Sequence, residues 1–467
     1  MTRSKLRVIP LGGLSEIGKN MIAMEYGNDI IIIDAGLMFP EEEMLGIDLV
    51  IPDISYLLHK KDKIKGIVIT HGHEDHVGAL PYVLPQLKAP IYATRLTLGL
   101  IRVKLKERKA FDGAVLKEVI PGEQLVLGNF KIEFFPVCHS IPDSVGLIID
   151  TPAGIVVHSG DFKLDYTPVS GKPTDLSRLA QVGGQGVLLL LSDSTYAEMP
   201  GYTPSERVVG ETLDNIMANS PGRVIVTTFS SLISRVQQVI DAAAKYQRRV
   251  FVIGRSMNDT VRMALELGYL NAPDGMLGRI DEARGLPHDK IVFITTGSQG
   301  EPTSALVRMA NRDHHQVHIH PGDTIVISAT PIPGNEAVVN RTVDNLFKQG
   351  AQVVYSKLAQ VHVHGHGSQE ELKLLLNLVK PRFFMPIHGE YRHLSLHASL
   401  AQSVGVPKEN IFVLEDGEVL ELSSEVAKVA GKVSSGNVYV DGLSVGDIGG
   451  IVLRNRRMLS KDGIVVA

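Results

Sequence analysis

The stretch His71-Gly72-His73-Glu74-Asp75-His76 constrains what this chain can fold into more than any other, because it places three imidazoles and two carboxylates within six residues. It follows residues 66–70, an apolar run that reads as a buried strand, and it precedes a helical pattern that begins near Val77. His71 and His73 can point the same way from the end of the strand, whereas Asp75 and His76 would lie in the first turn of the helix. Histidine nitrogen combined with carboxylate oxygen suits zinc or manganese. The stretch therefore predicts a strand-to-helix tip that offers ligands to two neighbouring metal ions.

Size and composition indicate a packed protein of two or three domains. The chain has 467 residues, of which 44% are hydrophobic and 21% charged. Its start lacks the apolar core of a secretory signal, and no apolar run approaches the roughly 18 residues of a membrane span. We therefore expect a cytoplasmic protein without membrane attachment. The net charge of −4 does not indicate a polyanion partner, so nucleic-acid binding would come from local patches or a metal centre.

Two rhythms of secondary structure alternate along the chain. Residues 6–195 show short β-rich runs with glycine and proline turns, and helical patterns at 77–86 and 95–109, which is typical of mixed sheets with helices outside. From about residue 203 to 355, regular β-α alternation predicts a parallel sheet with helices on both faces. The first rhythm then returns. We expect one α/β domain in two parts, 1–202 and 357–450, interrupted by an inserted α/β domain at 203–356, with 451–467 as a lead segment.

Further residues of the metal-ligating type follow strands in the interrupted domain. Asp34 closes a run of four isoleucines, and Asp161 follows another apolar run. An aspartate in such a place is often only a turn residue. With the histidine tip in the same domain, we expect it to belong to the site instead, together with the late histidines.

The series His71-x-His73-x-Asp75-His76, followed by His139, Asp161 and His388, resembles the ligand series of the metallo-β-lactamase superfamily. That resemblance implies an αββα sandwich. Ser192-Asp193-Ser194-Thr195, His364-Gly365-His366-Gly367 and Pro386-Ile387-His388-Gly389-Glu390 resemble the additional motifs of the β-CASP nucleases, in which a histidine at the last position goes with RNA substrates. Residues 11–20 and 254–257 extend the similarity to the bacterial ribonuclease J family. That family usually continues into a small C-terminal domain, so we expect this chain to lack most or all of it.

The resemblance implies two zinc ions per subunit, with manganese or magnesium as alternatives during activity. His71, His73 and His139 would hold the first ion, and Asp75, His76 and His388 the second. Asp161 would bridge the two ions, and Asp34 would accept a hydrogen bond from a ligand imidazole. His366 would act as the general acid, oriented by Asp193, so that His366, Asp193 and Asp75 form the expected catalytic set.

The family degrades RNA from 5′-monophosphate ends and also cuts internally, in RNA maturation and decay. This implies single-stranded RNA as substrate, namely mRNA and rRNA precursors, and a pocket for the terminal phosphate. We place that pocket at Phe229-Ser230-Ser231 and His362-Val363-His364-Gly365-His366, with Phe229 either stacked on a base or in the core. Asp48 and Asp441 would form a structural calcium site. We also expect a homodimer or homotetramer, weakened without the C-terminal domain, and RNA-decay or ribosome-associated proteins as partners.

Two alternatives stay open at this point. The motif at residues 71–76 is shared by metallo-hydrolases of small esters and thioesters, and a non-catalytic RNA-binding subunit is the other alternative. The inserted domain and the late histidines argue against the first. The presence of every inferred ligand argues against the second.

Overall fold

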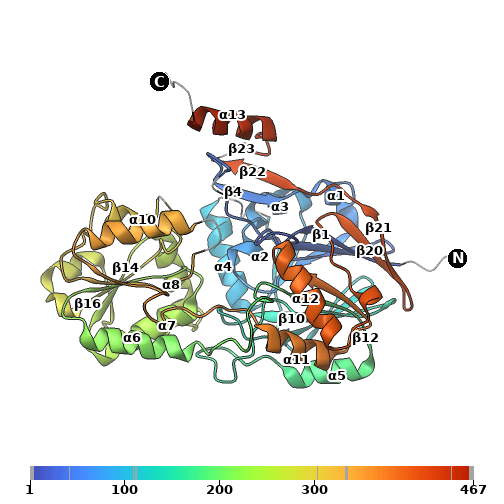
Figure 1. The fold of residues 1–467 in the computed structure, drawn as a ribbon, viewed down its shortest axis with the longest axis horizontal. Helices are drawn as coiled ribbons and strands as arrows, with labels where there is room; N and C mark the ends of the chain where they lie inside the picture. Colours follow the sequence, from blue (N-terminus) through green and yellow to red (C-terminus); the bar gives the residue numbers. More distant parts are fainter. Residues whose placement is uncertain are drawn as a thin grey trace.

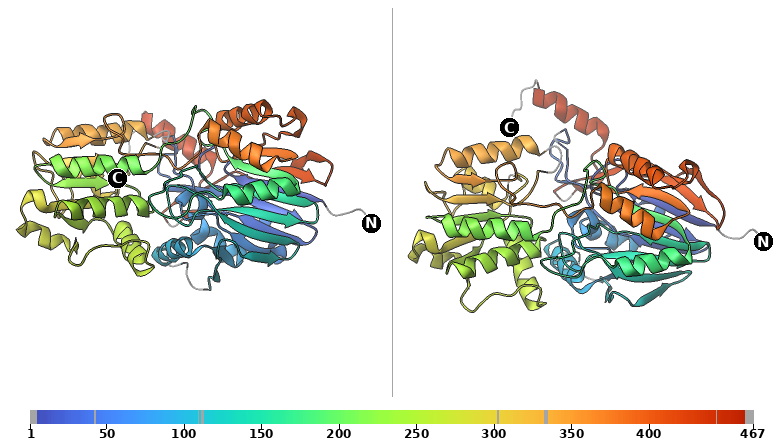
Figure 2. Two further views of the ribbon diagram at one scale, coloured as in Figure 1. Left: turned by 90° about the horizontal axis from the view of Figure 1, so that it is seen from below. Right: turned by 60° about the horizontal axis from the view of Figure 1, so that its bottom comes forward.

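Two lobes lie side by side in the computed structural model of the protein (Figure 1). The structure describes residues 5–461 except 42, 109, 111, 112, 302, 332–334 and 443, so residues 462–467 of the expected lead segment lie outside the described part. Figure 2 shows that the blue beginning of the chain and the darker orange segments share one lobe, whereas the yellow middle and the lighter orange helix α10 lie in the other.

Two facing sheets form the centre of the first lobe. The first sheet has the strand order β21-β20-β1-β2-β3-β5-β6-β7. Its strands are β1 (Leu6–Gly12), β2 (Met21–Tyr26), β3 (Asp29–Ile33), β5 (Ile64–Val68), β6 (Ile91–Ala93), β7 (Leu116–Glu118), β20 (Glu418–Leu422) and β21 (Ala427–Lys432). The second sheet has the order β19-β12-β11-β10-β9-β8. Its strands are β8 (Gln124–Leu127), β9 (Phe130–Pro136), β10 (Val145–Thr151), β11 (Gly154–His158), β12 (Val187–Asp193) and β19 (Phe383–Ile387).

Helices cover the outer face of each sheet. The first sheet packs on α1 (Ser55–Leu58), α3 (Leu80–Leu87) and α4 (Arg95–Glu107). The second sheet packs on α5 (Leu176–Gln185), α11 (Gln369–Val379) and α12 (Tyr391–Ser403). Between the sheets, apolar side chains such as Ile31, Phe134 and Leu189 form a common core. Because the central strands are buried on both faces, they read as near-continuous apolar runs. The predicted αββα sandwich is confirmed.

The second lobe is the parallel α/β unit that the middle of the sequence predicts. Its strands run parallel in the order β15-β14-β16-β13-β17-β18. They are β13 (Val224–Thr227), β14 (Arg249–Val252), β15 (Leu277–Gly278), β16 (Ile291–Thr295), β17 (Thr324–Ile327) and β18 (Gln352–Val354). One face packs on α6 (Arg207–Asn219), α7 (Ile233–Lys245) and α8 (Arg255–Glu266), and the other on α9 (Ala305–Ala310) and α10 (Glu336–Phe347).

The chain leaves the first lobe after β12 and returns to it next to the same strand. β12 and β19 pair in parallel with Leu189 opposite Phe383 and Asp193 opposite Ile387. This register brings Asp193 beside the residue that precedes His388. The end of β12 and the end of β19 therefore meet at one edge of the second sheet.

The remaining elements lie at the periphery. A small sheet joins β4 (Leu49–Pro52), β22 (Asn437–Asp441) and β23 (Ser444–Val445), and α13 (Gly450–Lys461) projects above it (Figure 1). The short 3-10 helices are Lys61–Lys63, Ile280–Gly285, His288–Lys290 and Lys408–Asn410. In the part of the chain that the structure describes, no helix is long and apolar enough to cross a lipid bilayer.

Candidate metal centre and active site

Loops that follow strands of both sheets build one cluster of histidine and aspartate side chains. His71 and His73 follow β5, and Asp75 and His76 lie in α2 (Glu74–Val77). His139 follows β9, Asp161 follows β11, Asp193 ends β12 and His388 follows β19. The structure thus brings together every residue that the sequence placed at the metal centre.

Three imidazoles form the first group. The Nδ1 atom of His73 lies 3.0 Å from Nε2 of His71 and 3.1 Å from Nε2 of His139. The carbonyl oxygen of Gly365 lies 2.7 Å from Nδ1 of His139, which fixes that nitrogen as a donor and turns Nε2 toward the other rings. Burial lowers the pKa of His71 and His139 well below the usual value and that of His73 to about 4. These rings are neutral near pH 7, and their nitrogens face one point, as metal ligands do.

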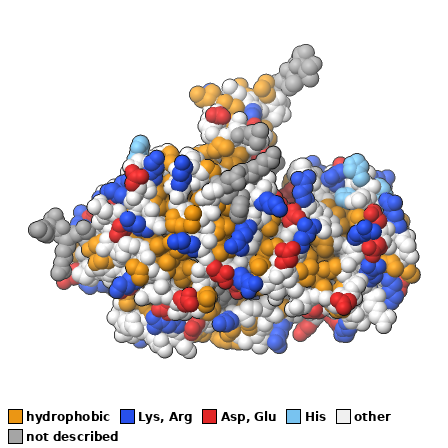
Figure 3. Space-filling view, turned by 180° about the vertical axis from the view of Figure 1, so that it is seen from behind, with side chains coloured by type: hydrophobic (Ala, Val, Ile, Leu, Met, Phe, Trp, Pro, Cys, Tyr) orange, Lys and Arg blue, Asp and Glu red, His pale blue; other side chains and the backbone are white. Residues whose placement is uncertain are grey.

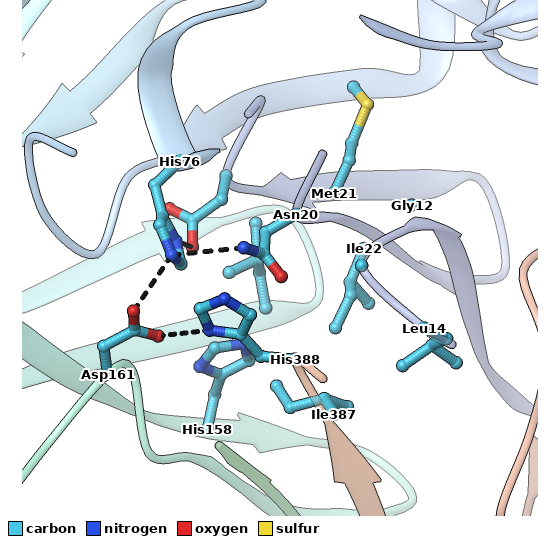
Figure 4. A pocket seen from close by; sticks show the side chains of 13 residues that line it. Gly12, Leu14, Asn20, Met21, Ile22, His76, His158, Asp161, Ile387 and His388 are labelled. Atoms are coloured by element: carbon cyan, nitrogen blue, oxygen red, sulfur yellow. Dashed lines mark hydrogen bonds and ion pairs between the residues drawn. The ribbon is translucent and has the colours of Figure 1, made fainter. Parts of the chain in front are cut away.

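Asp75, His76, Asp161 and His388 form the second group. Nε2 of His76 lies 3.2 Å from Oδ2 of Asp161, and Nδ1 of His388 lies 3.0 Å from its Oδ1 (Figure 4). Oδ2 of Asp161 also lies 3.7 Å from Nε2 of His71 and 3.9 Å from Nε2 of His139. The Asp161 carboxylate therefore lies between the two groups.

The second group fits a cation. Among the described residues, the buried Nε2 atom of His388 has no hydrogen-bond partner, although it lies 3.3 Å from Oδ2 of Asp75. Burial opposes charge on Asp161, yet the neighbouring His388 and His76 lower its pKa well below the usual range. In turn, burial opposes protonation of His388, but Asp161 raises its pKa to about 10. Several buried carboxylates thus attract positive charge to this place, and divalent ions can supply it.

Asp34 supports the second group from behind. Its Oδ2 atom lies 2.8 Å from Nδ1 of His76, and its Oδ1 atom accepts the backbone N–H of Thr70 at 2.8 Å. Asp34 and His388 both have left-handed backbone conformations, with φ of 62° and 54°. Such conformations are costly for residues other than glycine and often mark functional sites.

His366 and Asp193 form a third group beside Asp161. Nδ1 of His366 lies 2.7 Å from Oδ2 of Asp193. The other oxygen of Asp193 accepts hydrogen bonds from the N–H and hydroxyl of Thr195 at 3.0 and 2.8 Å. Burial opposes protonation of His366, but the Asp193 carboxylate raises the pKa of the imidazole above its usual value. The pair can hold a proton next to the metal centre.

The residues of the predicted phosphate pocket occupy two segments. Phe229, Ser230 and Ser231 follow β13 in the second lobe and are partly exposed. His364 lies on the linker that returns from that lobe, where its Nδ1 atom donates to the carbonyl of His366 at 2.9 Å and its ring stacks on Tyr196 at 3.6 Å. On the same linker, Nδ1 of His362 has no hydrogen-bond partner within the described chain. Burial lowers the pKa of both imidazoles to about 3, so neither carries a charge near pH 7.

The predicted calcium site shows other partners for its two carboxylates. Asp441 pairs with Arg456 at 2.9 Å, and Asp48 accepts the backbone N–H of Gly442 at 2.7 Å. The groups that gather ligand atoms in the described chain are those of the metal centre. Calcium binding by Asp48 and Asp441 stays a prediction.

Sequence reasoning missed two side chains that line a small cavity of about 10 Å³ behind the metal centre. The Nδ2 atom of Asn20 lies 3.2 Å from Nε2 of His76 (Figure 4). His158 accepts the backbone N–H of Gly160 at 3.0 Å, and burial lowers its pKa to about 4. Neither residue belongs to a spacing pattern, so only its neighbours in space show that it supports the site.

Charges on the molecular surface are mixed. Figure 3 shows lysine and arginine side chains interspersed with aspartate and glutamate over the face opposite to Figure 1. This distribution agrees with the small net charge of −4.

Comparison with known proteins identifies families for most of the chain. Residues 16–208 match the metallo-beta-lactamase superfamily, residues 221–346 match the beta-CASP domain of ribonuclease J, and residues 351–414 match a Zn-dependent metallo-hydrolase RNA specificity domain. A solved structure of a protein of unknown function from Enterococcus faecalis shares the fold, with a TM-score of 0.62 and 16% identity over 90% of this chain and all of that one.

Full-length relatives agree with the family matches. The chain is 48% identical to ribonuclease J 1 of Streptococcus pyogenes, 47% identical to ribonuclease J2 of Bacillus subtilis and 49% identical to ribonuclease J of Thermus thermophilus. Each alignment covers 99% of this chain and 82 to 83% of the relative. The metallo-β-lactamase fold implies divalent metal binding, and the histidine and aspartate groups described above fit it. The chain therefore belongs to the ribonuclease J family of metal-dependent ribonucleases.

Proposed function

We propose that this chain hydrolyses phosphodiester bonds of single-stranded RNA with two divalent cations, for which zinc suits the donor set. The approach of His388 to the tip at residues 71–76 carries the proposal. Its Nε2 atom lies 3.3 Å from Oδ2 of Asp75, although the whole inserted lobe separates the two residues in sequence. The imidazole nitrogen has no hydrogen-bond partner among the described residues, and a cation between it and the carboxylate could bind both atoms.

Each cation has its own set of protein ligands in the proposed site. His71, His73 and His139 would hold the first cation, and Asp75, His76 and His388 would hold the second. Asp161 would contribute its carboxylate to both, since this carboxylate lies between the two groups. Asp34 and the carbonyl of Gly365 keep His76 and His139 in the tautomers whose Nε2 lone pairs face the site.

Bound divalent cations supply Lewis acidity, which lowers the pKa of water and offsets the charge that develops on a phosphoryl group. The chain itself supplies the proton for the leaving oxygen. Asp193 accepts Nδ1–H of His366, so the Nε2–H bond is free to donate. Burial opposes protonation of His366, but the same carboxylate raises the pKa of the imidazole above its usual value and thereby favours the protonated form. His366 is therefore the general acid, and Asp193 orients it.

The position of the return linker indicates where the 5′ end of the RNA substrate binds. The turn Phe229-Ser230-Ser231 and the segment 362–366 supply hydroxyl, imidazole and backbone N–H groups for a terminal phosphate. Because His362 and His364 are neutral, recognition relies on hydrogen bonds more than on their charge. We infer 5′-to-3′ exonuclease activity that favours 5′-monophosphate ends, together with internal cleavage. The homodimer or homotetramer expected for the family stays a prediction, which sedimentation velocity checks.

One experiment tests the metal site and the substrate together. Metal analysis of the purified chain should give two ions per chain, and a chelator should abolish degradation of a 5′-monophosphate RNA. The triphosphate form of the same RNA should be degraded more slowly. His388→Ala should lose one ion and RNA hydrolysis, whereas His59→Ala, which changes an exposed histidine outside the site, should keep both.

Two results would contradict the proposal. Hydrolysis of glutathione thioesters with intact RNA would place the chain among small-molecule hydrolases. RNA binding without metal-dependent cleavage would indicate a non-catalytic subunit. Equal degradation rates for the 5′-monophosphate and the triphosphate forms of the RNA would contradict only the proposed terminal phosphate pocket.

A further inference from the structure

His397 is a fully buried imidazole outside the metal centre, and it contacts the loop that carries the proton-donating pair. It lies on α12, where its side chain has no exposed surface. Its Nδ1 atom lies 2.9 Å from the hydroxyl oxygen of Ser194, the residue that follows Asp193. Its ring packs edge-on against Phe384 of β19 at 4.8 Å. The contact with Ser194 therefore links α12 to the end of β12.

The hydrogen-bond pattern indicates which nitrogen of His397 carries the proton. The hydroxyl of Ser194 donates to the carbonyl of Ser192 at 3.2 Å, and a hydroxyl has only one hydrogen. Nδ1 of His397 must then be the donor toward the Ser194 oxygen. Nε2 has no partner among the described residues, and burial lowers the pKa of the ring to about 3, so the imidazole stays neutral. A directed chain of hydrogen bonds runs from His397 through Ser194 to Ser192.

Ser194 also holds the backbone of His388. Its N–H donates to the carbonyl oxygen of His388 at 3.2 Å, and the hydroxyl of Thr195 contacts the same oxygen at 3.3 Å. His388 has a left-handed φ of 54°, a conformation that the surrounding structure must maintain. The turn at residues 193–195 thus contains Asp193, which orients His366, and it also binds the backbone of His388, the residue of the second metal group with the left-handed φ.

The contact closes a ring of covalent and hydrogen bonds. From His388 the chain passes through Gly389 and the capping box at Glu390 into α12, and His397 lies on the second turn of that helix. From His397 the hydrogen bond leads to Ser194, and from Ser194 a second one returns to His388. Movement of β19 against β12 would have to break this ring.

We propose that His397 is a positioning residue, which acts through Ser194 to fix the distance between the His366–Asp193 pair and the second metal group at His388. The inference rests on the proposed function, because it assigns this distance to RNA hydrolysis. The polar and ring contacts of His397 within the described chain are those with Ser194 and Phe384, so it would act on the site through Ser194. A residue with a purely structural role would instead affect stability alone.

The test compares variants that separate the hydrogen bond from packing. His397→Phe keeps a ring against Phe384 and removes the donor, and Ser194→Ala removes the acceptor. We expect each change to lower kcat for RNA by about 10- to 100-fold, with KM changed less than about twofold. The double variant should be no slower than the slower single variant, since both changes break one connection. His397→Asn, which keeps a donor near the position of Nδ1, should recover part of kcat.

A matched control removes packing from the same helix without touching the ring of bonds. Leu394→Val shortens a fully buried side chain of α12 and should lower the midpoint of thermal unfolding while kcat stays within about twofold. A second readout does not depend on RNA. Zinc release to a chelator should be faster for one of the two ions in His397→Phe and Ser194→Ala, and unchanged in Leu394→Val.

The outcomes distinguish this inference from the proposed function. Full kcat and unchanged zinc release in His397→Phe would overturn the positioning role, as would losses in the double variant that multiply. A wild-type chain that does not degrade RNA would overturn the proposed function instead. In that case, the zinc-release comparison still decides whether His397 supports the second metal group.

Discussion

Asp416 gives the chain a pH-dependent stability that is measurable outside the metal centre. Its Oδ1 atom accepts the backbone N–H of Leu14 at 3.2 Å, and its neighbour Glu16 pairs with the buried Lys19 at 3.0 Å. Burial first, and then the Glu16 carboxylate, raise the pKa of Asp416 from 3.8 to about 7. Two carboxylates thus share one buried ammonium group, and a proton on Asp416 relieves their repulsion.

The sign and size of the effect follow from this shift. The folded protein binds the proton more tightly than the unfolded chain does, so the stabilisation is fully present below the unfolded pKa of 3.8 and is lost as the pH rises through about 7. For one group with these pKa values, the loss between about pH 6 and about pH 8.5 is roughly 1.4 kcal/mol of unfolding free energy. Asp416→Asn mimics the protonated carboxyl and removes this dependence.

Urea unfolding of the metal-loaded protein at several pH values measures the difference. Relative to the wild type, the unfolding free energy of Asp416→Asn should increase by about 1.4 kcal/mol between about pH 6 and about pH 8.5. Asp150→Asn, a change at a half-exposed carboxylate, should follow the wild-type curve. Parallel curves for the wild type and Asp416→Asn would refute the reasoning, because they would mean that Asp416 does not change its protonation between about pH 6 and about pH 8.5 in the folded protein.

Two further predictions concern the return linker and the junction of the lobes. Gly365→Ala would place a Cβ atom 2.5 Å from the His139 ring. We therefore expect metal analysis to show the loss of one ion, and kcat to fall by about 10-fold or more. The control Gly285→Ala, whose Cβ atom would meet open space, should change neither quantity. Arg235→Met would remove the hydrogen-bonded cation from the buried Glu206 carboxylate and leave it with Lys163 at 3.8 Å. The unfolding free energy, measured by denaturant titration, should fall by about 3 kcal/mol, and a loss below about 1 kcal/mol would show that Lys163 or solvent compensates the carboxylate.

Sequence patterns predicted the fold wherever the signal is local. The helix expected at residues 95–109 is α4 (Arg95–Glu107), and the β-α alternation expected from about residue 203 to 355 includes α7 (Ile233–Lys245). Both follow from apolar residues that recur at helical spacing. The pairing of β4 with β22 was not predicted, since Leu49 and Val440 are far apart in sequence and no local pattern selects a strand partner. The same reason explains why α12 was missed as a support of the site.

Prediction of the site also succeeded where the signal is local in the sequence and failed where it depends on contacts between distant residues. The spacing of His71, His73 and His76 identifies them as candidate metal ligands. The family resemblance then locates the remaining candidates. Asn20 and His397 are single polar residues in apolar surroundings, and a sequence offers no means of telling such residues from ordinary buried side chains. Their roles depend on which atoms they face, and this is known only from coordinates.

The return linker makes the inserted lobe part of the reaction centre. Val361 and Val363 are buried in the core of that lobe, and the carbonyl of Val361 accepts a hydrogen bond from Arg235 at 2.8 Å. A few residues later, the carbonyl of Gly365 accepts a hydrogen bond from His139, and the His366 imidazole pairs with Asp193. Any displacement of the inserted lobe along this linker would therefore shift His139, a proposed metal ligand, and His366, the proposed general acid, together.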